Sequence, residues 1–450
     1  MQTKKNDLIL TDEINEFIKL ALGKQEFTFL TGAAGTGKST ALRHLVSSLS
    51  GTKIRYVVLS PTALAAINVN GQTIHSFFKL PIGIIHQSNL RIKRESLDLY
   101  AKMDLMIIDE ISMVRADLLD AVDHILRMAK RNHKPFGGVR VVAIGDLYQL
   151  SPIINKEEDE VFKTFYKTGY FFSSKVFQDL LEQNSIKTLT LTKVFRQSDD
   201  KFINILHKIR DGSYNNSDLQ IINDRAGCEK TDNTIMLCST NSIKHQQNTT
   251  RINAIKTPEF VFTAKMTDDF AKQGENNLPS PANLILKIGA TVLFTKNNQT
   301  AGYYNGMIGT VESITDYKTD KPKITILSGG NSYVVEKEEW QKFAYEYNAK
   351  EDQMNKKTVG KFTQFPLDLG YAVTIHKSQG QTFEKILINL GYGAFCHGQT
   401  YVALSRCKTI EGLVLGQKIR DKDIIIDNDV QEFYESFFEK TKQKNDDDFF

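Results

Sequence analysis

Residues suited to binding phosphate stand close together near the N-terminus. The segment FLTGAAGTGKSTALRHL, residues 29–45, contains Gly32 and Gly37, and Gly37 is followed directly by Lys38 and Ser39. Glycines allow positive φ, so the backbone of such a loop can turn its N–H groups toward an anion at the start of a helix. Lys38 can reach the β- and γ-phosphates, and the Ser39 hydroxyl can ligate Mg²⁺. The segment therefore predicts a site for a nucleoside triphosphate. The loop alone does not identify the function, because proteins of many functions share it.

Further polar side chains follow two apolar runs, at the points where strands are expected to end. Asp109 and Glu110 follow one run, and Gln149 comes shortly after another. The carboxyl ends of parallel strands share one edge of a sheet, which is where open α/β proteins bind ligands. There Asp109 would hold Mg²⁺, Glu110 could accept a proton from the attacking water, and the neutral amide of Gln149 could sense the γ-phosphate. Acids that complement a helix dipole, and an ordinary strand exit at Gln149, are the alternatives.

The elements that would position these residues alternate between strand and helix. Apolar patterns predict strands at residues 26–31, 54–60, 104–110, 139–146 and 188–196, with helices between them, which favours a parallel sheet covered on both faces. A second α/β unit is predicted to begin with a strand at 234–238 and a helix at 242–255, and to resume near residue 370. Short strands with turn signals predict a small β-barrel inserted at 288–360. The expected divisions are 1–225, 226–430 and a C-terminal tail at 431–450, frayed over 444–450.

Composition narrows the class of protein. The chain has 450 residues, of which 41% are hydrophobic and 24% charged, enough to bury two or three cores. The 57 basic and 53 acidic residues give a net charge of +4, which permits a nucleic-acid partner without indicating one. No apolar run approaches the roughly 18 residues of a membrane span, and no signal peptide is visible, so a cytoplasmic protein is expected. The four cysteines, at 228, 238, 396 and 407, lack zinc-site spacing and are expected to be free thiols.

An ordered set of motifs resembles a known enzyme family. The motifs GAAGTGKST, VVLSPTALAA, DEIS, GDLYQLSP, VFRQ, AVTIHKSQGQTF and YVALSRCK are similar to those of superfamily-one DNA helicases of the RecD and Dda branch. Residues 120–142 resemble the signature of the petite-integration-frequency (PIF) family. The likeness spans residue 30 to about 415. In one departure, Ile14 stands where family members usually have a glutamine that reads adenine.

The resemblance implies a fold and an activity. The implied fold is α/β, with two RecA-like parallel-sheet domains, a small wedge insertion at 77–100 in the first, and an SH3-like β-barrel insertion in the second. The implied activity is ATP-dependent translocation from 5′ to 3′ on single-stranded DNA, by a monomeric bacterial or phage-like enzyme that needs Mg²⁺. The substrates would be duplex, fork or G-quadruplex DNA. A non-motor P-loop switch and an ATP-modulated single-stranded DNA-binding protein without hydrolysis are the alternatives.

The resemblance also assigns roles to residues around the nucleotide. Arg196 and Arg406 match arginines that meet the γ-phosphate, where a guanidinium stabilises the charge of phosphoryl transfer. Taken alone, either arginine would be a surface ion pair. If Arg406 comes from the second unit, the site is complete only when the units close. The implied catalytic residues are Lys38, Asp109, Glu110, Gln149, Arg196 and Arg406. The implied nucleotide contacts are Gly32, Gly35, Thr36, Gly37, Lys38, Ser39, Thr40, Gln379 and Gly380, with Ser39 and Asp109 holding Mg²⁺.

DNA contacts follow from the same resemblance. The implied residues are Pro61, Thr62, His75 and Ser76 in the first unit, and Thr374, His376, Lys377 and Ser378 in the second. Hydroxyls, histidines and a lysine suit contacts to the DNA backbone, which set position but do not read sequence. Either histidine could instead be a satisfied turn or core residue. Ile84, Ile85 and His86 are candidates for an apolar tip that splits the duplex, or for an ordinary hydrophobic loop.

Overall fold

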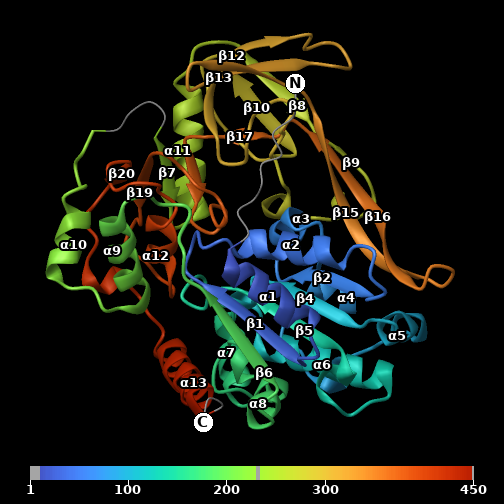
Figure 1. Ribbon diagram of the computed structural model, residues 1–450. Helices are drawn as coiled ribbons and strands as arrows, with labels where there is room; N and C mark the ends of the chain where they lie inside the picture. The colour runs from blue at the N-terminus through green and yellow to red at the C-terminus, as the bar shows by residue number, and fades with distance from the viewer. Residues whose placement is uncertain (1–10, 230–233, 448–450) are drawn as a thin grey trace.

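The computed structural model describes residues 11–229 and 234–447. Two units built on parallel sheets lie beside each other, with a β-rich region above them (Figure 1). The first sheet has the strand order β3-β2-β4-β5-β1-β6, and all its pairs are parallel. Its strands are β1 (Phe27–Gly32), β2 (Tyr56–Ser60), β3 (Gln72–Thr73), β4 (Leu105–Asp109), β5 (Arg140–Ile144) and β6 (Ile186–Leu191). The five predicted strands are confirmed; β3, only two residues long, was not predicted.

Helices cover both faces of the first sheet, as the alternating strand pattern requires. Val57 and Leu59 face one core together with helices α4 to α6 and α8, whereas Val58 faces a second core with α1 and α2. The helices of this unit are α1 (Asp12–Leu22), α2 (Lys38–Leu49), α3 (Ala63–Asn68), α4 (Ile74–Phe78), α5 (Arg94–Ala101), α6 (Ala116–Lys130), α7 (Lys156–Lys163) and α8 (Lys175–Glu182). The carboxyl ends of β1, β4 and β5 therefore meet at one edge, between two helical layers.

The second unit has a four-stranded parallel sheet in the order β18-β7-β19-β20. Its strands are β7 (Ile235–Cys238), β18 (Ala372–Thr374), β19 (Ile386–Asn389) and β20 (Leu413–Leu415), and its helices include α11 (Asn241–Asn253) and α12 (Gln399–Leu404). The predicted strand at 234–238 and helix at 242–255 are confirmed. This sheet also confirms that a second α/β unit encloses the β-rich insertion.

The chain enters the second unit earlier than predicted. Helices α9 (Asp200–Asp211) and α10 (Asn216–Asn223) lie beside β7 and β19 (Figure 1). Their apolar residues, among them Phe202 and Ile222, share one buried cluster with Ile235 and Ile388 of the second sheet. The boundary expected at 225 is therefore wrong, since the crossing lies before α9. Strand β6 also ends at Leu191 instead of residue 196, because the chain has already turned toward the second unit.

The inserted β region differs from the predicted barrel in extent. An antiparallel five-stranded sheet has the order β14-β13-β12-β11-β17, and β8 pairs with β10 beside it. These strands are β8 (Glu259–Thr263), β10 (Asn283–Lys287), β11 (Thr291–Phe294), β12 (Ile308–Thr315), β13 (Lys323–Ser328), β14 (Asn331–Val335) and β17 (Leu367–Leu369). The range predicted for the insertion, 288–360, is too short, because β17 of the same sheet lies beyond residue 360. Closure of this sheet into an SH3-like barrel stays a prediction.

A long hairpin within the insertion reaches back to the first unit. Strands β15 (Glu338–Asn348) and β16 (Gln353–Gln364) pair with each other outside the five-stranded sheet, and β16 also pairs with β9 (Lys265–Met266). The Tyr345 hydroxyl accepts a hydrogen bond from the N–H of Val58 at 2.8 Å, and Arg55 forms an ion pair with Asp352 at 2.9 Å. The hairpin, which runs down the side of the first unit in Figure 1, thus ties the insertion to both units.

The C-terminal segment is a helix rather than the predicted tail. Helix α13 (Asn428–Asp447) leaves the second unit and packs on the first, near α8 (Figure 1). Val430, Phe433 and Phe437 join the core of the first unit, where the Phe433 ring stacks on Phe172 with centroids 4.3 Å apart. The predicted fraying of residues 444–450 is wrong as far as Asp447, because the helix extends to that residue. Residues 448–450 lie outside the described part of the chain. No described helix is long and apolar enough to cross a bilayer.

Candidate nucleotide site between the two units

The phosphate loop has the geometry that its glycines predict. It joins β1 to α2, and Gly37 caps α2 with φ of 96°. Gly35 has φ of 83°, and a Cβ at this position would lie 2.6 Å from the Cβ of Arg196, so only glycine allows that close approach. The Lys38 ammonium folds over the loop and donates to the carbonyls of Gly32 and Ala33 at 2.6 and 2.9 Å. The loop leads into the start of α2, where the backbone N–H groups of the helix favour binding of an anion.

A cavity of about 430 Å³ opens beside this loop. Its walls come from both units and comprise Ile14, Ala34, Gly35, Gly37, Lys38, Ser39, Thr40, Glu110, Gln149, Phe195, Arg196, Gly380 and Arg406. Most of the predicted nucleotide contacts therefore line one cavity. Thr36 is buried and its hydroxyl donates to the Ala33 carbonyl, so its side chain shapes the loop. Ile14 and Phe195 add apolar surface, and Phe195 was not predicted to be part of the site.

The two carboxylates lie at the end of β4, as predicted. Asp109 is the last residue of that strand, and Glu110 has a positive φ of 55°, which turns the chain out of the sheet. Burial raises the pKa of Asp109, and the neighbouring charge of Glu110 raises it further. Burial also raises the pKa of Glu110, although Lys38 and Arg406 oppose this effect. Asp109 is buried and Glu110 is partly buried, and both line a groove together with Ser39. Carboxylate and hydroxyl oxygens are the ligands that Mg²⁺ prefers, and a cation would favour the ionised form of Asp109, so Asp109 and Ser39 fit Mg²⁺.

Gln149 and Gln379 connect the units at the edge of this site. The Gln379 amide nitrogen lies 3.3 Å from the Glu110 carboxylate and 3.3 Å from the side-chain oxygen of Gln149. Gln379 belongs to the turn after β18 in the second unit, whereas Glu110 and Gln149 follow strands of the first. The predicted general base and the predicted phosphate sensor therefore both contact the second unit. A change in the relative position of the two units would therefore change the contacts of the Glu110 and Gln149 side chains.

Two arginines, the buried Arg406 and the partly buried Arg196, face the cavity from opposite units. Arg406, on the turn after α12, is 1% exposed, and its Nε donates to the Val402 carbonyl at 2.9 Å. Burial, with Arg196 adding to it, lowers the pKa of Arg406, and burial lowers the pKa of Arg196 to about 10. Within residues 11–229 and 234–447, neither guanidinium forms an ion pair with a carboxylate. Two neighbouring cations, one buried and one partly buried, that lack an ion-paired carboxylate create a site for a multiply charged anion.

A groove of about 620 Å³ adjoins the nucleotide cavity. Three of the predicted DNA residues line it: Thr62 from the first unit, and His376 and Lys377 from the second. Tyr304 of the insertion and Lys408 of the second unit also face it. Because Ser39 and Glu110 line both the groove and the nucleotide cavity, the two are continuous. Its mixture of hydroxyl, aromatic and basic groups suits a single strand of nucleic acid.

Other predicted DNA residues are occupied by local contacts. Ser378 is fully buried and its hydroxyl donates to the Ile375 carbonyl, whereas Thr374, which is 6% exposed, accepts from the N–H of Lys377. The Ser76 hydroxyl accepts from the Gln72 amide at 3.0 Å. Burial lowers the pKa of His75, with Arg115 adding to the effect. For Ser378 the side chain therefore stabilises a turn and does not reach the groove. Direct DNA contact by Pro61, His75, Ser76 and Thr374 stays a prediction.

The tip of the wedge insertion differs from the predicted one. Ile85 is buried in the first core, and its N–H donates to the Asp117 carboxylate at 2.8 Å. Ile84 is partly buried and His86 is exposed, with its ring 5.7 Å from that of Phe165. Ile82, which is 97% exposed, is the apolar residue that projects here. The prediction of Ile85 as part of the tip is corrected, since it anchors the loop.

Comparison with known proteins agrees with these features. A family model for PIF1-like helicases matches residues 5–220. The ATP-dependent DNA helicase Pif1 of Campylobacter jejuni is 31% identical over 400 residues, which cover 84% of this chain and 86% of that relative. The chain belongs to the PIF1-like helicase family. This membership decides for a helicase over the non-motor switch and the DNA-binding protein without hydrolysis.

Solved structures of relatives match the fold of this helicase. Pif1 from Bacteroides sp in complex with ADP-AlF4 is 35% identical and superposes with a TM-score of 0.85, over 96% of this chain and 98% of that one. The Bacteroides helicase in complex with ADP-AlF3 and single-stranded DNA, at the same identity and coverage, gives a TM-score of 0.67. The overall structure of this helicase therefore superposes more closely on the former complex than on the one that also holds DNA.

Several residues of the site were not predicted from the sequence. Tyr401 lies within the YVALSRCK motif, but nothing in the motif shows that its hydroxyl accepts a hydrogen bond from Ala34 at 2.8 Å. Arg210 and Tyr434 contact the loop after β5 from α9 and α13, outside any motif. The four cysteines are free, and no cluster of metal-binding side chains occurs in the described ranges.

Proposed function

We propose that this PIF1-like helicase hydrolyses ATP in the cavity between its units and uses the reaction to move from 5′ to 3′ along single-stranded DNA. The observation that carries the proposal is the pair of guanidiniums of Arg406, which is buried, and Arg196, which is partly buried; both face the phosphate loop, from opposite units, and neither has a carboxylate partner in the described chain. A γ-phosphate would supply the missing charge to both. ATP binding would thereby hold the units together.

The side chains at this site divide the work of hydrolysis. Lys38 and the loop N–H groups bind the phosphates, and Glu110 accepts the proton of the attacking water. Arg196 and Arg406 stabilise the charge that develops on the transferred group. Ser39 and Asp109 would hold Mg²⁺, which neutralises phosphate charge when bound. Gln149 and Gln379 orient groups near the γ-phosphate because they link Glu110 to the second unit.

DNA binding couples to this site through one short turn. His376 and Lys377 line the groove, and Gln379, two residues further on, contacts Glu110. A strand held in the groove would contact both units and favour their closed arrangement, which completes the nucleotide site. Since one chain supplies every residue of that site, a monomer suffices. Action in the cytoplasm and on fork or G-quadruplex DNA belongs to the same proposal, and the direction of movement rests on the family.

Strand separation on tailed duplexes tests this function. The purified protein is mixed with ATP, Mg²⁺ and a fluorescent duplex that carries a single-stranded tail at its 5′ or its 3′ end. We expect separation of the 5′-tailed duplex only, and none by the Glu110→Gln variant. Separation of the 3′-tailed duplex would overturn the direction. Failure on both substrates, by protein that still hydrolyses ATP, would overturn unwinding itself.

A further inference from the structure

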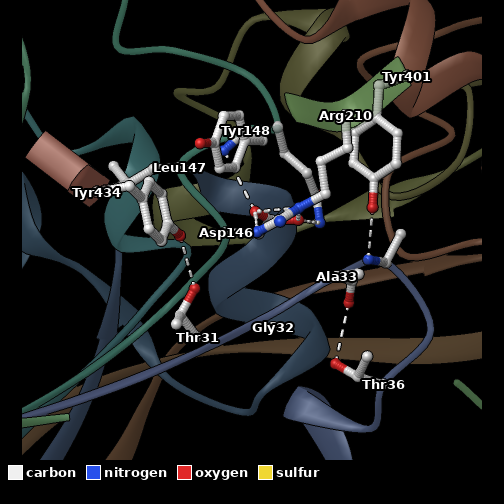
Figure 2. A network of polar contacts seen from close by, with 12 residues as sticks. Thr31, Gly32, Ala33, Thr36, Asp146, Leu147, Tyr148, Arg210, Tyr401 and Tyr434 are labelled. Carbon is white, nitrogen blue, oxygen red and sulfur yellow. Dashed lines mark hydrogen bonds and ion pairs between the residues drawn. The ribbon is translucent and has the colours of Figure 1, made fainter. Parts of the chain in front are cut away.

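A buried ion pair joins the two units behind the phosphate loop. Asp146 follows β5 of the first unit, and its side chain is fully buried. Arg210 comes from α9, and its Nη2 lies 2.8 Å from one carboxylate oxygen, while Nε donates to both oxygens at 3.2 and 3.3 Å (Figure 2). Burial alone would raise the pKa of Asp146, but Arg210 and Lys38 outweigh it and hold the pKa below its usual value. The pair is therefore ionised at neutral pH.

Aromatic rings enclose this ion pair. The Arg210 guanidinium carbon lies 4.4 Å from the ring centroid of Tyr148 and 5.9 Å from that of Tyr434, and the two rings stack with centroids 4.7 Å apart. The Tyr434 hydroxyl lies 2.9 Å from that of Thr31, the residue before Gly32 (Figure 2). Rings on this side limit the access of water, and a lower local dielectric strengthens the charge interaction. The guanidinium is thus fixed in one orientation.

The same carboxylate holds the side chain of Gln149. The Gln149 amide nitrogen donates to the second oxygen of Asp146 at 3.2 Å. This contact settles the orientation of the amide, because its oxygen is then free to accept from Gln379, at 3.3 Å. A continuous set of polar contacts therefore runs from Arg210 of the second unit through Asp146 and Gln149 of the first to Gln379 of the second. Gln149 lines the nucleotide cavity, whereas Arg210 and Asp146 do not.

We propose that Arg210 and Asp146 are positioning residues for Gln149, which they aim at the γ-phosphate only while α9 of the second unit is docked. The proposal rests on the ATP site described above. Neither member of the pair lines the nucleotide cavity. When the pair is weakened, Gln149 can rotate, so contacts made only with the γ-phosphate are lost while those with the α- and β-phosphates are kept.

Binding of two nucleotides distinguishes this role from a general loss of stability. The Arg210→Lys variant keeps the charge but loses the planar fork. We expect its affinity for the non-hydrolysable triphosphate adenylyl imidodiphosphate to fall about tenfold, and its affinity for ADP to change less than about twofold. Lys208→Ala is the matched control, because Lys208 is on the same helix and pairs with Asp218 at 3.0 Å, away from the site. Both affinities should be unchanged in this control.

A double variant tests whether the effect passes through Gln149. In a Gln149→Ala background, Arg210→Lys should cause no further loss of triphosphate affinity, since residues that act as a unit are not additive. Additive losses, or equal losses for ADP and the triphosphate analogue, would overturn the proposal. If Arg210→Lys does not fold, Asp146→Asn/Arg210→Gln makes the same comparison with a neutral pair. Because these are binding measurements, a protein that hydrolyses no ATP would contradict the proposed function and leave this test intact.

Discussion

The hydroxyl oxygen of Tyr401, in the second unit, accepts a hydrogen bond from the backbone N–H of Ala34, in the phosphate loop, at 2.8 Å (Figure 2). Both residues are buried, with Tyr401 3% and Ala34 6% exposed. Burial raises the pKa of Tyr401 to about 12, so the hydroxyl is neutral at physiological pH. A side chain of α12 therefore holds the loop that would bind phosphate, and the conformation of that loop depends on how the two units sit.

Removing this hydroxyl should destabilise the protein. In Tyr401→Phe the ring still packs, but the buried N–H of Ala34 loses its acceptor, which costs about 1–3 kcal/mol. We expect the free energy of unfolding in urea to fall by that amount. Tyr392→Phe is the control, because Tyr392 is fully exposed. The free energy of unfolding of this variant should not change. If the Tyr401→Phe variant and the unchanged protein had the same free energy of unfolding, the hydrogen bond to Ala34 would not stabilise the protein.

Lys38→Ala and Glu110→Gln should fail in different ways. Lys38 would contact the bound phosphates directly, so its loss should reduce both nucleotide affinity and turnover. Loss of the Glu110 carboxylate should lower the rate of phosphate release by roughly 10²-fold or more, as expected for a general base, and leave affinity nearly unchanged. Glu259→Gln, at an exposed position of β8, controls for the substitution itself. The assigned roles would be refuted by equal losses of affinity in the two site variants.

Stability should fall in mild acid through His397. Its Nδ1 accepts from the N–H of Asp427 at 2.8 Å, so Nε2 carries the proton and donates to the Leu147 carbonyl at 2.7 Å. Burial lowers the pKa of His397, although the Leu147 carbonyl and Asp427 oppose this. The unfolded chain therefore takes up the proton first, and stability is complete above the unfolded pKa of about 6.5 and is lost as pH falls below it.

Thermal unfolding between pH 7.5 and 5 checks this contribution. His75, His207 and His376 also have pKa values lowered by burial, so the total slope has several sources. His397→Gln keeps a donor for Leu147 but cannot be protonated, and its unfolding midpoint should depend less steeply on pH. An unchanged pH dependence would mean that His397 is not among those sources.

The candidate nucleotide site could be located from the sequence because its signals are local. The phosphate loop, Asp109–Glu110 and Gln149 each follow a buried strand within a few residues, and parallel strands bring such positions to one edge. The contacts that join the units have no local signal. Arg210 and Asp146 are 64 residues apart, and Tyr434 and Thr31 are 403 apart, so only the folded chain reveals them.

The errors in the predicted fold have the same origin, because contacts between distant parts of the chain leave no local signal in the sequence. The sequence does not show which sheet the segment of α9 covers, and Phe202 packs in the second unit. The β15–β16 hairpin was assigned to the barrel because its pattern is that of any strand pair, whereas Tyr345 is buried against the first unit. Ile85 resembled a projecting tip because it lies in an apolar loop, but the N–H contact with Asp117 fixes it in the core.

The central claim is that one chain couples ATP hydrolysis to a strand bound across both units, and phosphate release with and without DNA tests it most directly. Oligothymidine is titrated into the purified protein with ATP and Mg²⁺ at several salt concentrations. We expect strong stimulation, with the logarithm of DNA affinity falling by about 0.7 per neutralised phosphate against the logarithm of salt concentration. His376→Ala should lose stimulation and keep the basal rate. A basal rate unchanged by saturating oligothymidine would contradict the account.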